Sequence, residues 1–269
     1  ARSSNVYRVS YANDTQFTDV TDLDKVKSEG AAVSTRHKAY IAGGRENETT
    51  VLNDISKLNF SNETLSTAIT ANLYQARTIL DGTSNDSYGY FGGGTGLPVS
   101  VSAIMSTVDR LDFSSDTSNT VNKGSLLEDR SYGLAACGNR YYGYFGGGYT
   151  EPGVYHSFIS RVDYASDTTN NPARGPLTAA AYQLAATSNS DYGYFMTGAG
   201  PGTPAPHFST TQRLDFSNDT ADTLVKGACN YPKNDAGGVS AREHGLAQMG
   251  ADIVRGPATA YNESVEQTP

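Results

Sequence analysis

The sequence predicts an all-β protein built from a repeated unit of about fifty residues, and three observations support this prediction. The chain contains 28 glycines and 18 tyrosines, and only 18% of its residues are charged, which favours short strands and tight turns over amphipathic helices. A strand-and-turn motif occurs five times, and an aromatic–glycine motif occurs three times at a similar spacing.

The strand-and-turn motif sets the period. Its closing threonines lie at positions 15, 64, 117, 168 and 220, so the intervals are 49, 53, 51 and 52 residues. In the third copy Leu111 and Phe113 alternate with Arg110 and Asp112, which predicts a strand with one apolar and one charged face. The Ser, Asn and Asp residues that follow favour a turn, because their side chains hydrogen-bond to nearby backbone groups. The copies are "RVSYANDT" (8–15), "KLNFSNET" (57–64), "RLDFSSDT" (110–117), "RVDYASDT" (161–168) and "RLDFSNDT" (213–220).

The aromatic–glycine motif predicts a second strand in each unit. It reads "YGYFGGG" at 88–94, "YYGYFGGG" at 141–148 and, in a more divergent form, "YGYFMTGAG" at 192–200. We expect the glycines to end the strand where another backbone comes close or φ is positive, and the aromatic rings to fill the space between units. A phosphate-binding loop would need a following helix and a Lys–Ser/Thr pair, and neither is present.

Two further strands complete the unit. One precedes the aromatic–glycine motif, at 130–139, 182–190 and, less clearly, 77–86, and the other follows the turn, around 120–126 and 223–229. Four short antiparallel strands per unit are typical of a β-propeller blade.

The two chain ends predict how the units join. The first strand-and-turn motif begins at Arg8, with no room for two preceding strands, whereas nearly fifty residues follow Thr220. The segment "REHGLAQMGADIVRGP" (242–257) is similar to residues 130–148, and the insertion at 230–241 is expected to be a loop. We therefore predict one domain, residues 1–257, followed by a polar tail, residues 258–269. The domain is expected to be a five-bladed β-propeller with four antiparallel strands per blade and one blade shared between the N- and C-termini.

These motifs resemble kelch-type repeats, in which a glycine pair ends the second strand and an aromatic residue marks the third. Kelch blades usually carry a tryptophan in the fourth strand, and this chain has none. The combination "RLDFSNDT", "LAAT" and "YGYFGGG" is more similar to tandem-repeat proteins of marine bacteriophages, cyanophages especially. That resemblance implies a virion-associated protein with a structural or host-attachment role.

The composition excludes several classes of partner. A net charge of −8 and an isoelectric point near 4.9 argue against a nucleic-acid-binding surface, which needs clustered Lys and Arg. No apolar run reaches the eighteen residues of a membrane span. Cys137 and Cys229 do not make a disulfide framework, and are either two unpaired thiols or a single bridge.

Few residues suggest catalysis or metal binding. The histidines, His37, His156, His207 and His244, match no zinc spacing, and no G-x-S-x-G motif occurs, so no catalytic residue and no cofactor are expected. Most aspartates belong to the repeat, and so do the cations Arg8, Lys57, Arg110, Arg161 and Arg213. We interpret each cation as a partner for an aspartate of the neighbouring unit, with anion binding as the alternative. Asp19, Asp22 and Asp24 form either an acidic surface turn or a calcium site.

Seven Asn-x-Ser/Thr sequences are explained either by turn chemistry or by glycosylation. They lie at Asn13, Asn47, Asn59, Asn62, Asn85, Asn218 and Asn262, and three of them fall within the repeated turn.

The loops that follow the aromatic–glycine strands differ between units, and variable loops on a rigid scaffold commonly carry recognition. We therefore predict a ligand-binding site on this loop face, with sugar rings stacking on aromatic side chains. The expected partners are a host-surface glycan or other virion proteins, with the chain present in many copies on a particle or outside the cell. The alternative is a carbohydrate-active enzyme, which would need two carboxylates flanking a glycosidic bond. The candidate residues are Tyr149, Tyr155, His156, His207 and Phe208.

Overall fold

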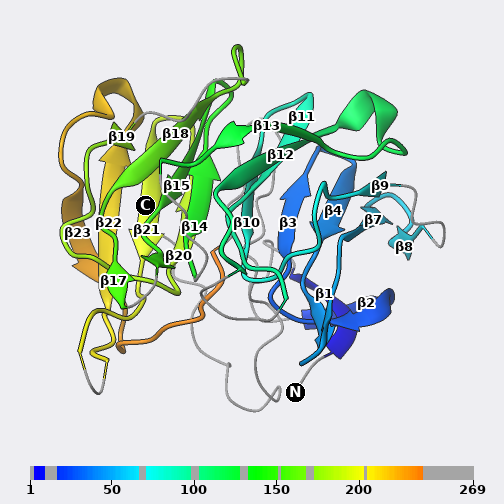
Figure 1. Ribbon diagram of the computed structural model, residues 1–269, viewed down its shortest axis with the longest axis horizontal. Coiled ribbons are helices and arrows are strands. Elements are labelled where there is room, and N and C mark those ends of the chain that lie inside the picture. Colours follow the sequence, from blue (N-terminus) through cyan, green and yellow to red (C-terminus); the bar gives the residue numbers. More distant parts are fainter. Residues whose placement is uncertain are drawn as a thin grey trace.

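The computed structural model describes residues 3–9, 17–66, 71–97, 103–127, 133–150, 153–167, 173–202 and 205–238, and these residues form an all-β structure. Four antiparallel sheets follow one another along the chain, from the blue strands at the right of Figure 1 to the yellow and orange strands at the left. Within each sheet, the strand order follows the chain. The prediction of repeated four-stranded antiparallel units is confirmed.

The first sheet contains β3 (Ala31–Ser34), β4 (Lys38–Ala42), β7 (Asp54–Asn59) and β8 (Thr64–Leu65), and β9 (Ala71–Asn72) also pairs with β7. The second contains β10 (Asp81–Ser84), β11 (Tyr88–Gly92), β12 (Thr107–Asp112) and β13 (Val121–Ser125). The third contains β14 (Ala135–Gly138), β15 (Tyr142–Gly146), β18 (Ile159–Asp163) and β19 (Ala173–Arg174). The fourth contains β20 (Ala185–Ser188), β21 (Tyr192–Met196), β22 (Thr210–Asp215) and β23 (Leu224–Ala228).

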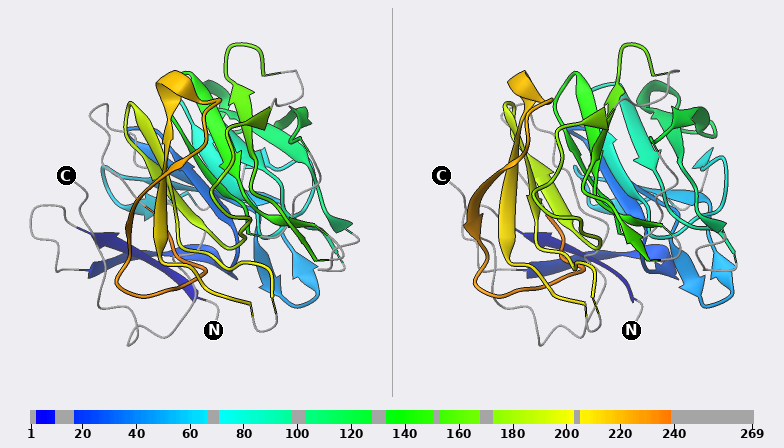
Figure 2. Two further views of the ribbon diagram at one scale, coloured as in Figure 1. Left: turned by 90° about the vertical axis from the view of Figure 1, so that its left-hand side faces the viewer. Right: turned by 60° about the vertical axis from the view of Figure 1, so that its left-hand side comes forward.

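Three hairpins accompany the sheets. They are β1 (Ser3–Val9) with β2 (Phe17–Lys27), β5 (Arg45–Asn47) with β6 (Thr50–Val51), and β16 (Tyr149–Thr150) with β17 (Val154–Tyr155). The last two residues of β1 begin the first copy of the strand-and-turn motif, and both side views place the first hairpin beside the lower ends of the sheets (Figure 2). Its strand β2 contacts β5 and β8, so the first unit packs beside the second.

The turn of the repeated motif forms as the sequence predicts. In the second and fourth sheets it is a short 3-10 helix, η2 (Phe113–Ser115) and η3 (Phe216–Asn218). The carboxylate of Asp112 accepts a hydrogen bond from the backbone nitrogen of Ser114 at 2.8 Å, and Asp215 accepts one from Ser217 at 2.9 Å. These bonds hold the first turn of each 3-10 helix.

The first strand of each sheet lies next to the first strand of the following sheet. β3 contacts β10, β10 contacts β14, and β14 contacts β20. Short residues permit this approach, and the serine hydroxyls bridge the strands. Ser84 Oγ donates to the carbonyl oxygen of Ser34 at 3.1 Å, and Ser188 Oγ donates to that of Gly138 at 2.7 Å. Four equivalent strands are thereby packed side by side, each the first strand of its sheet.

The aromatic–glycine strands join neighbouring sheets. A Cβ atom added to Gly92 would lie 2.7 Å from Phe145, and one added to Gly146 would lie 2.6 Å from Phe195. Both phenyl rings are fully buried. The next glycines end the strand in left-handed backbone, with φ of +69° at Gly147. The structural interpretation of this motif is confirmed, because its glycines make room for an aromatic ring of the next sheet.

The predictions about the chain ends fall largely outside the described residues. Residues 10–16 and 239–269 are not among them, so the structure does not test the shared blade or the boundary at residue 257. Within the described part, no helix is long and apolar enough to cross a membrane.

Candidate functional site

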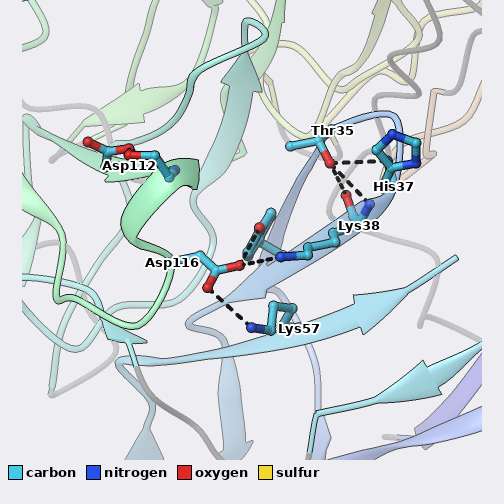
Figure 3. Close-up of polar contacts among 8 residues, drawn as sticks. Thr35, His37, Lys38, Lys57, Asp112 and Asp116 are labelled. Carbon is cyan, nitrogen blue, oxygen red and sulfur yellow. Dashed lines mark hydrogen bonds and ion pairs between the residues drawn. The ribbon is translucent and has the colours of Figure 1, made fainter.

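The repeated charges form one arrangement between successive sheets, which we call the inter-sheet clamp. In each clamp the carboxylate of the repeated turn accepts a hydrogen bond from a tyrosine of the preceding unit. The same carboxylate forms ion pairs with two cationic side chains of that unit. Between the first and second sheets, Asp116 contacts Tyr40 Oη at 2.8 Å, Lys38 Nζ at 2.9 Å and Lys57 Nζ at 3.2 Å (Figure 3). The sequence interpretation of the repeated cation as a partner for a neighbouring aspartate is therefore confirmed.

The same clamp recurs along the chain. Asp167 contacts Arg110 at 2.6 Å, Tyr90 at 3.3 Å and Lys123 at 3.4 Å. Asp219 contacts Arg161 at 2.8 Å, Tyr144 at 2.9 Å and Arg174 at 3.1 Å. In the first unit, Arg8 forms an ion pair with Glu63, which occupies the equivalent turn position of the second unit.

An aromatic ring three residues before each clamp carboxylate covers the clamp tyrosine. Phe113 stacks on Tyr40 with ring centroids 4.9 Å apart, Tyr164 on Tyr90 at 4.7 Å, and Phe216 on Tyr144 at 5.0 Å. This cover keeps the three clamp tyrosines, Tyr40, Tyr90 and Tyr144, at most 1% exposed.

The clamp alters the ionisation of its members. Burial raises the pKa of each of the three clamp tyrosines far above its ordinary value, and the neighbouring carboxylate raises it further. Burial also acts to raise the pKa of Asp116, but hydrogen bonds from Lys38, Tyr40 and Lys57 outweigh this effect and hold that pKa below the ordinary value. The three phenols thus stay protonated and the Asp116 carboxylate stays ionised, which suits a structural contact.

A second charged pair is buried inside the second sheet. Arg77 and Asp109 are both 0% exposed, and Arg77 Nη2 lies 2.7 Å from Asp109 Oδ2. Arg77 Nη1 also donates to the carbonyl oxygens of Gly93 and Thr107, at 3.1 Å and 2.9 Å. Burial lowers the pKa of the Arg77 guanidinium, and Asp109 acts in the opposite direction. Sequence reasoning missed this pair, because neither residue recurs in every unit.

On the loop face, three tyrosine rings converge into a group that we call the tyrosine cluster. Tyr149 and Tyr155 face each other across the β16–β17 hairpin, with centroids 5.3 Å apart. Tyr182, which precedes the first strand of the next sheet, lies 5.9 Å from Tyr149 and 5.4 Å from Tyr155. All three side chains are half-buried. Two successive units thus contribute rings to one surface.

The other predicted loop residues are divided between surface and interior. His156 is only 6% exposed, and its Nε2 lies 3.0 Å from Thr150 Oγ1, so it supports the hairpin from beneath. His207 is exposed. It lies on the other side of Ala199 from Tyr182, because Ala199 forms an antiparallel bridge with each of these two residues. Phe208 packs against the buried residues between the third and fourth sheets, where its ring fills the space beside Gly200. The structure thus brings Tyr149 and Tyr155 together, leaves His207 exposed, buries His156, and packs the partly buried Phe208 ring against the core.

Tyr182 was missed because it belongs to a different unit from the hairpin. Its position is two residues before the "LAAT" strand, where the sequence shows no variable loop. Thr78 occupies the same position in the second sheet and bridges to the following loop at Thr95, as Tyr182 bridges to Ala199. This pairing with the loop is a relation that only the structure shows, so the sequence offered no signal for Tyr182.

The three aspartates considered for calcium are engaged in other contacts. Asp19 accepts a hydrogen bond from Asn5 at 2.9 Å, Asp22 from Ser4 at 3.0 Å and Asp24 from Ser56 at 2.7 Å. No group of three or more His, Cys, Asp or Glu residues is arranged to hold a metal ion in the part of the chain that the structure describes. These contacts favour the acidic surface interpretation.

The structure bears on two further sequence alternatives. Cys137 and Cys229 are both free thiols, so the single bridge is wrong. The side chains of five sequon asparagines accept a hydrogen bond from the residue two positions later, which supports turn chemistry. These are Asn47, Asn59, Asn62, Asn85 and Asn218, whereas Asn13 and Asn262 lie outside the described residues. The donor is the backbone nitrogen, as in an Asx turn, for all but Asn218, which accepts from the hydroxyl of Thr220.

Comparison with known proteins identifies a shared fold. No protein-family model matches the sequence, and no curated protein matches it. Among solved structures, one described as "Structure of YjhT" is similar, with a TM-score of 0.70 and 12% sequence identity over 92% of this chain and 87% of that chain. At this identity the similarity shows the fold alone. Because 298 solved chains match, the architecture is too widely used to determine a function.

Proposed function

We propose that the chain is a non-enzymatic binding or structural protein of a bacteriophage particle, built as a five-bladed β-propeller with one blade shared by the chain ends. The resemblance of its repeats to those of marine phage proteins supports the virion assignment. The proposed ring is supported by the β1–β2 hairpin, which packs beside the first sheet and pairs Arg8 with Glu63, as one unit pairs with the next elsewhere.

We further infer that the loop face binds a glycan of the host surface, and the tyrosine cluster is the observation that carries this inference. Aromatic side chains that are half-buried offer a firm apolar surface with polar hydroxyl groups at its margin, which suits the alternating apolar and polar faces of a sugar ring. Thr150 and His207 supply further polar groups beside the rings. Four of the five repeated cations, Arg8, Lys57, Arg110 and Arg161, pair with an acid of the next unit, which favours recognition by the residues that differ between units.

The affinity of one such site is expected to be weak. Each aromatic contact contributes roughly 1 kcal/mol to the binding free energy, in addition to the contribution of the buried area. We therefore expect a dissociation constant near 1 mM for one sugar, which corresponds to a binding free energy of about −4 kcal/mol. Many copies on one particle would convert weak sites into firm attachment, because later contacts form at high effective concentration.

Binding should be measured with a multivalent display of the protein on a glycan array and on host cells. Tyr155→Ala and Tyr182→Ala should each weaken binding about tenfold, since a loss of about 1.4 kcal/mol is one factor of ten. The matched control is Tyr141→Ala, because Tyr141 is 59% exposed and lies at the opposite end of β15 from the hairpin. The control should bind as the parent does, and all three variants should keep the parent melting temperature within a few degrees.

The outcomes separate the candidate roles. Equal binding by the parent and both cluster variants would refute the glycan site. A protein that binds no glycan but is found in purified particles by mass spectrometry would be a structural component instead. Release of reducing sugars from a bound glycan would support the carbohydrate-active enzyme.

A further inference from the structure

Backbone hydrogen bonds fix the two units that meet at the tyrosine cluster to each other. Gly148 N donates to the carbonyl oxygen of Ala181 at 2.8 Å, and Ala181 N donates to that of His156 at 3.2 Å. Tyr155 and Tyr182 are the chain neighbours of His156 and Ala181. The backbone therefore holds two phenol rings from different units beside each other, with centroids 5.4 Å apart.

Neighbouring phenols of this kind are joined by oxidation. Loss of one electron and one proton from each of two tyrosines gives two phenoxyl radicals, and these form a carbon–carbon bond between ring positions next to the hydroxyl groups. The hydrogen atoms at those positions then move to the oxygens, so both phenols are restored in the product, dityrosine. In total two electrons and two protons leave the protein, and hydrogen peroxide accepts them to give two water molecules. A haem peroxidase is the class of catalyst that carries out this reaction.

Exposure and ring orientation distinguish Tyr155 and Tyr182 from a buried tyrosine pair between units. Tyr90 and Tyr164 have centroids only 4.7 Å apart, but they are 0% and 7% exposed and their planes are stacked at 19°. Tyr155 and Tyr182 are both half-buried, so an oxidant in solution reaches them. Their planes are tilted by 59°, so a small rotation of either ring brings the reactive ring edges together.

Other tyrosine pairs lie within one strand and cannot join two units. Tyr142 and Tyr144 of β15 have centroids 6.4 Å apart, and Tyr192 and Tyr194 of β21 have centroids 6.5 Å apart. Coupling within such a pair would leave the contact between sheets unchanged. The tyrosine cluster is therefore the place where an accessible pair of phenols crosses a unit boundary.

We propose that Tyr155 and Tyr182 are a site of oxidative coupling, at which a dityrosine bond fastens the β16–β17 hairpin to the fourth sheet. The co-reactants are hydrogen peroxide and a haem peroxidase. The bond holds the third and fourth units together independently of the hydrogen bonds and ion pairs between them. This modification goes beyond the proposed glycan site and does not depend on it, because coupling needs only the two phenols.

The bond closes a loop over residues 155–182. A cross-link over a loop of this length restricts the unfolded chain, so it should raise the urea midpoint of unfolding by about 1 M. The coupled protein is therefore distinguishable from the uncoupled protein by its stability as well as by its mass.

Treatment of the dilute native protein with a haem peroxidase and hydrogen peroxide tests the site. Dityrosine is followed by its fluorescence, and tandem mass spectrometry of peptides from the monomeric fraction identifies the joined residues. We expect a peptide pair that joins Tyr155 to Tyr182 and has lost two hydrogen atoms. Tyr155→Phe and Tyr182→Phe keep the ring but remove the phenol, so each should abolish this product. Tyr141→Phe is the matched control and should keep it, because Tyr141 is 59% exposed and lies outside the tyrosine cluster.

Several results would overturn the proposal. Dityrosine found only in dimers would show that exposed tyrosines of two copies couple instead, and a monomeric fraction without dityrosine would show that the pair does not react. A link between Tyr149 and Tyr155, with none to Tyr182, would show that the hairpin closes on itself. Equal urea midpoints for the coupled and untreated monomers would refute the fastening of the two units. Glycan binding enters none of these measurements, so their outcome is separate from that of the proposed function.

Discussion

Gly147 tests whether the aromatic–glycine motif serves packing, and the change to make is Gly147→Ala. The residue has a φ of +69°, which costs an alanine roughly 1–2 kcal/mol. An added Cβ atom would lie 2.4 Å from Leu184 Cδ1 and 2.6 Å from the carbonyl oxygen of Ala181. Overpacking of this kind costs about 1–3 kcal/mol, so the free energy of unfolding should fall by about 2–5 kcal/mol in total.

Gly153→Ala is the matched control for the backbone term. Gly153 also has a positive φ, +86°, but an added Cβ atom would meet nothing within 4 Å. This variant should lose only the roughly 1–2 kcal/mol of the dihedral penalty. The difference between the two variants therefore isolates the contact with the next sheet.

Urea unfolding followed by far-ultraviolet circular dichroism measures both losses. With a slope of about 3 kcal/mol per molar urea, Gly147→Ala should lower the midpoint by about 0.7–1.7 M, and Gly153→Ala by about 0.3–0.7 M. Equal shifts for the two variants would refute the argument that these glycines make room for the neighbouring sheet.

Two further predictions concern buried ionisable side chains. Asp109→Asn should lower the free energy of unfolding by about 3–5 kcal/mol, because Arg77 would remain charged without its partner. The double variant Asp109→Leu with Arg77→Met should lower the free energy of unfolding much less, because it leaves no buried charge. Chemical denaturation of the two variants and the parent measures both losses. The three clamp tyrosines should stay protonated in the folded protein at a pH where exposed tyrosines ionise. Because folding raises their pKa, their contribution is fully present below about pH 10 and is lost as the pH rises above it, which a phenolate absorbance titration of folded and unfolded protein would detect.

The periodic features of the fold could be predicted from the sequence. The spacing of the strand-and-turn motif predicted strands at the right places, and the repeated Arg–Asp pattern predicted contacts between units such as Arg161 with Asp219. These predictions succeed because a residue that recurs in each unit has the same environment in each unit. Repetition therefore serves as evidence for a structural role.

Features that occur once were harder to predict. Tyr182 joins Tyr149 and Tyr155 only because loops of successive units lie side by side, which is a tertiary relation without a local pattern. Phe208 was placed with its neighbour His207 on the surface, but adjacent residues of an extended segment point to opposite sides, so one is exposed and the other is packed. The register that decides between them is not encoded in loop composition.

The direction of the clamps has a consequence for assembly. Each unit offers donors on one side and an acid on the other, so successive units join head to tail and the contact is not self-complementary. Head-to-tail contacts form a closed object when the rotation per unit divides a full turn, and an open filament when it does not. The buried rings of Phe145 and Phe195 are held against Gly92 and Gly146 of the preceding sheets, so these contacts limit how closely successive sheets approach. A larger residue in place of Gly92 or Gly146 would push two successive sheets apart and so change the angle at which the next unit is added.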